Sequence, residues 1–178
     1  MRHYFLAPLL SLTALLTPIA TSEDAAPDML APIDLSSPEA TAFSMMRAMY
    51  QGDASMVDQV FADGATLRRV TDAGDLRPDG LQRWRDWVGT LETGAAHEVL
   101  FGVETETYGT LASVWAPFTI TVNGDLVGCG INQLTMARQA DDWRIVFGMD
   151  TNAPISSCDT FKEGYLARHD QGAQFSDH

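Results

Sequence analysis

A carboxylate near the end of a predicted strand is the first candidate for acid–base chemistry. Asp150 follows Trp143, Ile145 and Phe147 in a run of alternating residues, but it has the opposite parity from them. If Asp150 faces an apolar interior, burial raises its pKa, as a proton-shuttling carboxylate requires. The alternative is an exposed aspartate that caps the turn ahead of Asn152.

His97 is the second candidate, because it is the only histidine expected inside the folded part of the chain. His3 falls in a removable leader, and His169 and His178 fall in the tail. A histidine in a pocket can act as a general acid or base near neutral pH. The neighbouring Glu98 points to the opposite face of the strand and is not an obvious orienting partner. Alternatively, His97 is a strand-start residue at the rim of a pocket or in solvent.

Other residues could hold a ligand without reacting with it. Asn132 and Gln133 lie in a predicted strand, so one of them must face inward, and an inward Asn132 would anchor a carbonyl or hydroxyl group. Several large apolar residues suit pocket walls and core positions equally well. They are Met45, Met49, Phe61, Trp84, Trp115 and Phe118. Trp115 and Phe118 have opposite parities, so they should face opposite sides unless Pro117 introduces a bulge. We expect a small ligand that is apolar or of mixed polarity.

Several classes of function lack support in the sequence. No His-x-His, His-x-x-x-His or Cys-x-x-Cys pattern indicates a metal, and no Gly-x-Ser-x-Gly elbow or glycine-rich phosphate loop occurs. We therefore predict neither a metal nor a cofactor. The formal net charge of −13 disfavours nucleic acid and anionic lipid as partners.

The first residues have the order of a secretory signal. Met1-Arg2-His3 is basic, residues 4–16 are mostly apolar, and small residues surround position 20. We predict a signal peptide over residues 1–22, cleaved between 20 and 25, and export to the periplasm or the medium. The apolar run is shorter than the ~20 residues that span a bilayer, so no membrane span is expected in the mature protein. A buried N-terminal helix is the alternative.

The two cysteines of the chain, Cys129 and Cys158, both lie beyond the predicted signal. An oxidising compartment permits a disulfide between them, and an exported protein with an even cysteine count usually forms one. The bridge would close a loop of about 30 residues, worth on the order of 3 kcal/mol in the loop-entropy treatment. Two free thiols are the alternative.

The hydrophobic periodicity predicts helices first and strands afterwards. Residues 23–35 indicate a leader without regular structure, and Ser37, Asp53 and Gly52 suit the ends of two helices. Helices are predicted over 38–51, 53–60 and 81–91, and strands over 65–70, 97–108, 110–122, 126–138 and 143–151. Gly128 and Gly130 within one strand predict bulges and bending. The tail, 153–178, has no clear period beyond a short turn around 161–165.

This order predicts one α+β domain over residues 36–152, followed by a C-terminal extension over 153–178. About three N-terminal helices pack on one face of a strongly curved antiparallel sheet. Such a sheet cannot close tightly against its helices, so we expect a cone with an interior pocket.

Five segments also carry a family resemblance in order and spacing. They are Tyr50–Asp53, Phe61–Ala65, Leu111–Phe118, Cys129–Asn132 and Trp143–Ile145. Over residues 38–152 the chain resembles the nuclear transport factor 2-like (NTF2-like) superfamily, and within it the exported lumazine-binding-like and polyketide-cyclase-like (SnoaL-like) members. The resemblance implies the cone fold and a homodimer formed through the outer face of the sheet.

The function that the resemblance implies is broad, because this fold serves isomerases, cyclases, dehydratases, binding modules and interaction domains. Similar proteins often carry histidines where Ala62 and Gly128 stand, and an aromatic residue where Met45 stands. Each change removes a polar or aromatic group from the pocket. The leading hypothesis is therefore a non-catalytic, exported small-molecule-binding domain. An enzyme using Asp150 and His97, and a dimeric protein-interaction module, are the alternatives.

Overall fold

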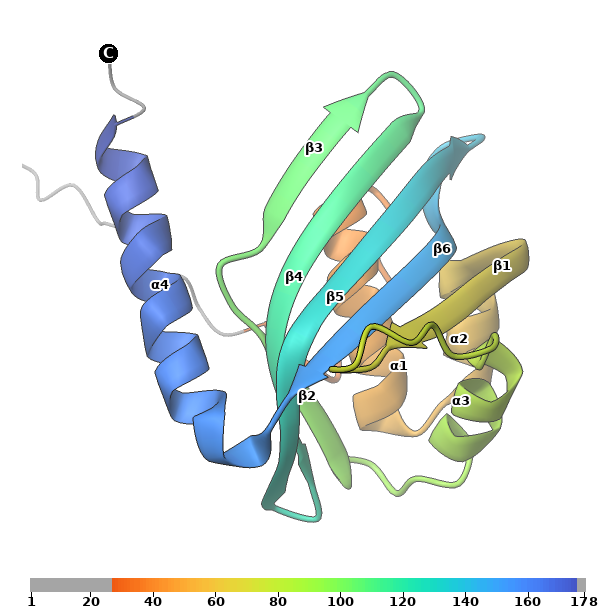
Figure 1. The fold of residues 1–178 in the computed structure, drawn as a ribbon. Helices are drawn as coiled ribbons and strands as arrows, with labels where there is room; N and C mark the ends of the chain where they lie inside the picture. Colours follow the sequence, from red (N-terminus) through yellow and green to blue (C-terminus); the bar gives the residue numbers. More distant parts are fainter. Residues whose placement is uncertain (1–26, 176–178) are drawn as a thin grey trace, which may run out of the picture.

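A computed structural model describes residues 27–175 of the chain, so the predicted signal peptide lies outside the described residues. Three helices, α1, α2 and α3, cover one face of a curved sheet, and a fourth, α4, lies on its other side (Figure 1). The helices are α1 Pro38–Gln51, α2 Ala54–Val60, α3 Leu81–Val88 and α4 Cys158–Phe175. The strands are β1 Phe61–Val70, β2 Ala96–Leu100, β3 Glu104–Tyr108, β4 Leu111–Val122, β5 Asp125–Gln139 and β6 Asp142–Ala153. The predicted α+β cone architecture is confirmed.

The first two helices begin and end at the residues that the sequence indicates. The Ser37 hydroxyl accepts a hydrogen bond from the backbone N–H of Ala40 at 3.1 Å, which satisfies a free donor at the start of α1. Gly52 ends α1 with a φ of 69°, a left-handed conformation that glycine adopts without strain. The Asp53 carboxylate then caps α2 by accepting from the N–H groups of Ser55 and Met56.

The sheet is mixed rather than wholly antiparallel. Its order is β1-β6-β5-β4-β2, with β3 also paired to β4, and β1 runs parallel to β6. The expectation of an entirely antiparallel sheet is wrong at this pair. Parallel strands need a long connection, and α3 and the four strands between β1 and β6 supply it. Strand β1 thereby becomes one edge of the sheet, beside the helices.

The predicted strand over 97–108 is in fact two strands, and Pro117 lies opposite the break. Proline has no N–H to donate to a neighbouring strand, so pairing is interrupted there. The backbone N–H of Phe101, between β2 and β3, donates instead to the Pro117 carbonyl at 3.0 Å. Pro117 causes no bulge in β4, and Trp115 and Phe118 face opposite sides of the sheet. Trp115 is 43% exposed, whereas Phe118 is 2% exposed.

Strand β5 bends where its glycines lie, as the sequence predicts. The β4–β5 register shifts between Ile120 and Thr121, which leaves Val127 as an extra residue beside Gly128. At Gly130 the backbone of β6 approaches so closely that a Cβ would lie 1.7 Å from the Thr151 carbonyl oxygen. Only glycine fits such an approach, which pulls β6 tightly around the curved sheet.

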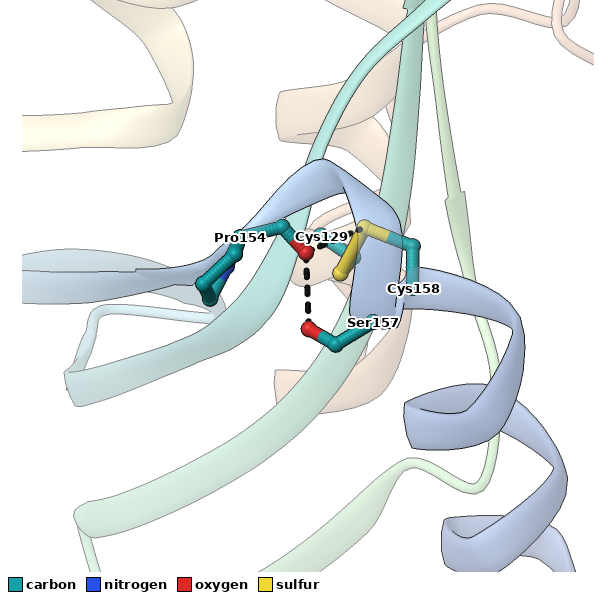
Figure 2. The surroundings of a disulfide bond; sticks show 4 residues. All are labelled: Cys129, Pro154, Ser157 and Cys158. Carbon is teal, nitrogen blue, oxygen red and sulfur yellow. Dashed lines mark hydrogen bonds between the residues drawn. A yellow bond between two sulfur atoms is a disulfide. The ribbon is translucent and has the colours of Figure 1, made fainter.

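The C-terminal extension forms a helix that the sequence does not reveal. A disulfide joins Cys129 of β5 to Cys158 at the start of α4, as predicted, with a Cα–Cα distance of 5.6 Å (Figure 2). Further along α4, the rings of Phe161 and Tyr165 pack edge-on against Phe101. Helix α4 is therefore fixed by a covalent bond at one end and by an aromatic cluster in its middle.

The hydrophobic core lies between the concave face of the sheet and helices α1 and α2. Its largest fully buried side chains include Met46, Met136 and Ile145. Residues 27–35 have no regular structure, as predicted, but they pack on α1. The side-chain amide of Gln51 donates to the carbonyls of Met29 and Ala31 at 3.0 and 3.1 Å. None of the described helices is long and apolar enough to cross a bilayer.

Candidate functional site

A cavity of about 710 Å³ opens between the concave face of the sheet, helices α1 and α3, and the edge strand β1. Its apolar wall comes from α1, α3 and the middle of β4. Residues of this wall include Met45, Met46, Met49, Trp84, Phe118 and Ile120. The cavity exists because β4 and β5 bend away from the helices and leave space that the core side chains do not fill.

Four polar side chains, which we call the polar row, face this cavity from four different strands: Arg69 of β1, Asp150 of β6, Asn132 of β5 and Glu98 of β2. Strand register explains why the first three lie side by side. Arg69 is the direct partner of Asp150, and Asp150 is the direct partner of Asn132. Residues that face each other across adjacent strands project from the same side of the sheet.

Glu98 and Asn132 form the inner end of the polar row. The Asn132 side-chain Nδ2 donates to Glu98 Oε1 at 2.6 Å, and Asn132 is only 5% exposed. Burial raises the pKa of the Glu98 carboxyl to about 7, and the negative charge of Asp150 acts in the same direction. The hydrogen bond from Asn132 and the charge of Arg69 oppose the rise without cancelling it. Glu98 can therefore hold or release a proton near neutral pH.

Arg69 and Asp150 form the outer end of the polar row. Their ion pair is bidentate, with Arg69 Nε donating to Asp150 Oδ1 at 2.8 Å and Nη2 donating to Oδ2. The hydrogen bonds to Asp150 raise the pKa of the Arg69 guanidinium further above its ordinary value. The Asp150 side chain is 16% exposed, so the pair closes one side of the cavity while remaining in contact with solvent.

The structure brings most, but not all, of the predicted site residues together. Asp150 and Asn132 line the cavity with four of the predicted wall residues, Met45, Met49, Trp84 and Phe118. The other three candidates do not line it. Phe61 packs in the core with its ring edge-on to Trp84, and Trp115 lies on the outer face of the sheet. His97 lies against Tyr50, with 5.2 Å between the ring centres.

Sequence reasoning missed the two residues that complete the polar row. It set Glu98 aside because its parity is opposite to that of His97, yet Glu98 is the member of that pair that faces the cavity. The signal was present in Ala96, which shares the parity of Glu98 and is fully buried. Arg69 was missed because the parallel pairing of β1 with β6 was not foreseen, and only this pairing brings Arg69 to Asp150.

The arrangement offers hydrogen-bonding and acid–base groups rather than metal ligands. No group of three or more His, Cys, Asp or Glu side chains within residues 27–175 is placed to hold a metal ion. A carboxyl with a pKa near 7, an amide and an ion pair can bind a carbonyl or hydroxyl group, and can exchange a proton with it.

Comparisons with known proteins give similarity in structure without similarity in sequence. No protein-family model matches the chain, and no curated protein matches its sequence. An NTF2-like protein of unknown function from Pseudomonas putida superposes with a TM-score of 0.53 and 17% identity, covering 65% of this chain and 83% of the other.

Two further solved structures agree with this comparison. A candidate dehydratase of the NTF2-like family from Streptomyces avermitilis gives a TM-score of 0.54 and 16% identity, covering 68% of this chain and 96% of the other. An NTF2-like protein of unknown function from Shewanella baltica gives 0.50 and 15%, covering 64% and 89%. Together with the helices, the curved sheet and the cavity between them, these similarities show that the chain has the NTF2-like fold.

Proposed function

We propose that this chain is an exported small-molecule-binding protein whose ligand occupies the cavity beside the polar row. The observation that carries the proposal is the cavity itself. Its volume of about 710 Å³ falls within the range of roughly 300–1,000 Å³ that is typical of small-molecule sites. More than half of its lining residues are apolar, and its polar groups include the four convergent side chains of the polar row, a combination that such sites use to bind and orient a ligand.

The polar row would orient the ligand. The Asn132 amide has a second N–H and a carbonyl oxygen beyond its bond to Glu98, and Glu98 in its protonated form adds an O–H donor. A ligand carbonyl or hydroxyl group placed here would satisfy these groups. The methionines of α1 would contact the apolar part of the ligand, and their flexible side chains adapt to irregular shapes.

Two observations support export. The sequence of residues 1–22 has the order of a secretory signal, and the Cys129–Cys158 disulfide is of the kind that forms and persists in oxidising compartments. If the signal is removed, the chain loses Arg2 and no acidic residue, so the net charge changes from −13 to −14. Such a charge keeps protein molecules dispersed in solution by mutual repulsion.

The neutral fluorescent probe N-phenyl-1-naphthylamine tests whether the cavity admits a ligand. Gly128 lines the cavity, and a Cβ there would meet Ile120 Cγ2 at an ordinary 3.5 Å, so Gly128→Phe can fill the cavity without backbone strain. We expect the wild type to bind the probe and Gly128→Phe to bind it at least tenfold more weakly. Gly164→Phe is the matched control, because a Cβ at Gly164 meets nothing within 4 Å. Equal binding by all three proteins would contradict the proposal.

One observation favours an acid–base enzyme as a second candidate function. Glu98 has a pKa of about 7, lies in the cavity and is held by Asn132, while Asp150 carries its charge nearby. A general acid or base is most effective when its pKa is near the working pH. In this reading Glu98 moves the proton, in place of His97, and Asp150 with Arg69 stabilises charge on the substrate.

The enzyme hypothesis has its own test, which separates it from binding alone. On any substrate that the wild type isomerises, cyclises or dehydrates, we expect Glu98→Gln to lower kcat by at least a hundredfold. The same variant should keep its affinity for N-phenyl-1-naphthylamine within about threefold. Full turnover by Glu98→Gln would exclude Glu98 as the acid or base and leave the binding function as the better account.

A further inference from the structure

The cavity collects positive charge in a chain that is acidic overall. Of the eleven Lys and Arg side chains, all but Arg2 fall within residues 27–175, which leaves ten. Four of these ten line the single cavity described above: Arg68, Arg69, Arg77 and Arg83. They come from β1, from the loop that follows it and from the first turns of α3, so the fold gathers them at one side of the opening.

Three of the four arginines lack an acidic partner among the described residues. Arg69 is paired with Asp150, whereas Arg68, Arg77 and Arg83 make no ion pair within residues 27–175. Six basic side chains of residues 27–175 lie outside the cavity. Arg85, Arg138 and Arg144 are each paired with a neighbouring aspartate, whereas Arg47, Lys162 and Arg168 make no ion pair with a described residue. Arg85 is paired with both Asp58 and Asp86, Arg138 with Asp141, and Arg144 with Asp142. Three of the four positive charges at the cavity are therefore left without an ion-pair partner among the described residues, in a chain that is rich in acidic residues.

Arg68 adds an independent sign that a partner is missing. Its Nε is buried and has no hydrogen-bond acceptor among the described residues. Asp79 lies close enough for Arg68 to lower the pKa of its carboxyl, but that carboxylate mainly accepts from the backbone N–H groups of Leu67 and Leu81. Buried side-chain donors usually have a hydrogen-bond acceptor, so an unsatisfied N–H on a residue that lines a cavity suggests an acceptor that belongs to a ligand.

The acidic groups that face the cavity do not neutralise this cluster. Asp150 is already paired with Arg69, and Glu98 is held by Asn132 at the inner end of the polar row. Arg68 is partly buried, so its unpaired charge attracts an anion more strongly than a fully exposed group does, whereas Arg77 and Arg83 are exposed and accessible to a ligand that enters from solvent. Planar guanidinium groups also match the two oxygens of a carboxylate or the oxygens of a sulfonate.

We propose that the cavity is specific for an amphipathic organic anion. Its anionic group would lie against Arg68, Arg77 and Arg83, and its apolar body would extend along Met45, Met49 and Phe118. This inference deepens the proposed binding function and rests on it. An anionic ligand has the same sign as the overall charge of −13 and is repelled by it. Selection of an anion must therefore come from the local arginine cluster and not from the field of the whole protein.

Two probes that differ by one anionic group test the inference. N-phenyl-1-naphthylamine is neutral, and 8-anilino-1-naphthalenesulfonate is the same ring system with a sulfonate added. Both are titrated against the wild type and against the cavity variant Arg68→Gln/Arg77→Gln/Arg83→Gln. The control variant is Arg85→Gln/Arg138→Gln/Arg144→Gln, which removes the same number of positive charges away from the cavity. Because Arg68 is partly buried, Arg77→Gln/Arg83→Gln is measured as well.

The measured quantity is the preference for the anion, the Kd of the neutral probe divided by the Kd of the sulfonate. We expect the preference to fall at least fivefold in both cavity variants and to change less than twofold in the control. An unchanged preference in the cavity variants, or an equal fall in the control, would overturn the inference while leaving the binding function intact. If the wild type binds neither probe, the proposed function fails and the inference fails with it.

Discussion

Glu98 is a carboxyl group on which burial, a hydrogen bond and two charges act together. Burial is the largest influence and raises its pKa to about 7, because the charged form of the carboxyl loses hydration by water. Asn132 donates to Glu98, and Asp150 and Arg69 face it from β6 and β1. The folded protein therefore holds a proton on Glu98 over a pH range in which an unfolded chain has already released it.

The stability of the protein should consequently fall as pH rises through neutrality. The folded pKa of Glu98, about 7, lies above its ordinary value of 4.5, so the native state binds the proton more tightly between these values. Protonation thus favours folding at low pH, and this contribution is lost as pH rises from 4.5 through 7. We expect Glu98→Gln to gain about 1–3 kcal/mol in unfolding free energy over the wild type at pH 8. The gain should be small at pH 4.5.

Urea unfolding at the two pH values measures this difference. The matched control is Glu106→Gln, since Glu106 is an exposed residue of β3. A gain that is the same at both pH values, or equal for the two variants, would contradict an ionisation penalty at Glu98.

Single residues also show how far the sequence could predict the site. Asp150, Asn132 and four apolar wall residues are named as candidates by the sequence, and all six line the cavity. Alternation along a strand and helical spacing are local patterns, so they can be recognised without the structure. Glu98 and the arginines were not foreseen. Glu98 reaches the cavity only because one face of β2 turns inward, and Arg69 does so only because β1 pairs with β6. Both arrangements are set by contacts between residues that lie far apart in the sequence.

Local signals predicted some elements and failed for others. Helices α1 and α2 carry their own capping residues, and the Asn123-Gly124 turn marks the β4–β5 hairpin, so the sequence was sufficient there. Helix α4 has no clear apolar stripe in its sequence. Its position depends on a disulfide and on an aromatic cluster with Phe101, which are tertiary contacts that periodicity does not reveal.

The disulfide should matter chiefly for α4 and for the stability of the whole domain. The bridge joins residues 29 positions apart, and removing such a bridge typically costs about 2–4 kcal/mol. We expect Cys129→Ala/Cys158→Ala to unfold at lower urea concentration and to be cleaved first within α4 by a protease. An unchanged unfolding midpoint together with an unchanged cleavage pattern would contradict the role assigned to the bridge.

The two glycines of β5 should respond differently to the same substitution. At Gly130 a Cβ would lie 1.7 Å from the Thr151 carbonyl oxygen, whereas at Gly128 it would meet Ile120 at 3.5 Å. We expect Gly130→Ala to destabilise the protein by roughly 3 kcal/mol or more, because backbone must shift. Gly128→Ala should change stability by less than about 1 kcal/mol. Thermal unfolding checks the order, and equal losses would contradict the close β5–β6 approach.

At the scale of the whole molecule, the outer face of the sheet is the surface on which we propose a homodimer. Large apolar side chains lie exposed there, including Tyr108 at 89%, Leu111 at 56% and Trp115 at 43%. Such exposure is typical of an interface. The wild type should sediment as a dimer at micromolar concentration and Leu111→Asp as a monomer. Leu76→Asp, an exposed leucine beyond β1, is the control, and a monomeric wild type would contradict this expectation.

On the function proposed above, a small molecule enters the cavity between the sheet and the helices and stays bound there. Mass spectrometry of the mature protein from an exporting host, first native and then denatured, tests this property most directly. The wild type should show a native mass that exceeds the denatured mass by a discrete small-molecule increment, and Gly128→Phe should show none. The same increment in Gly128→Phe would contradict a ligand site in this cavity. So would its absence from the wild type even after incubation with the small-molecule extract of the host.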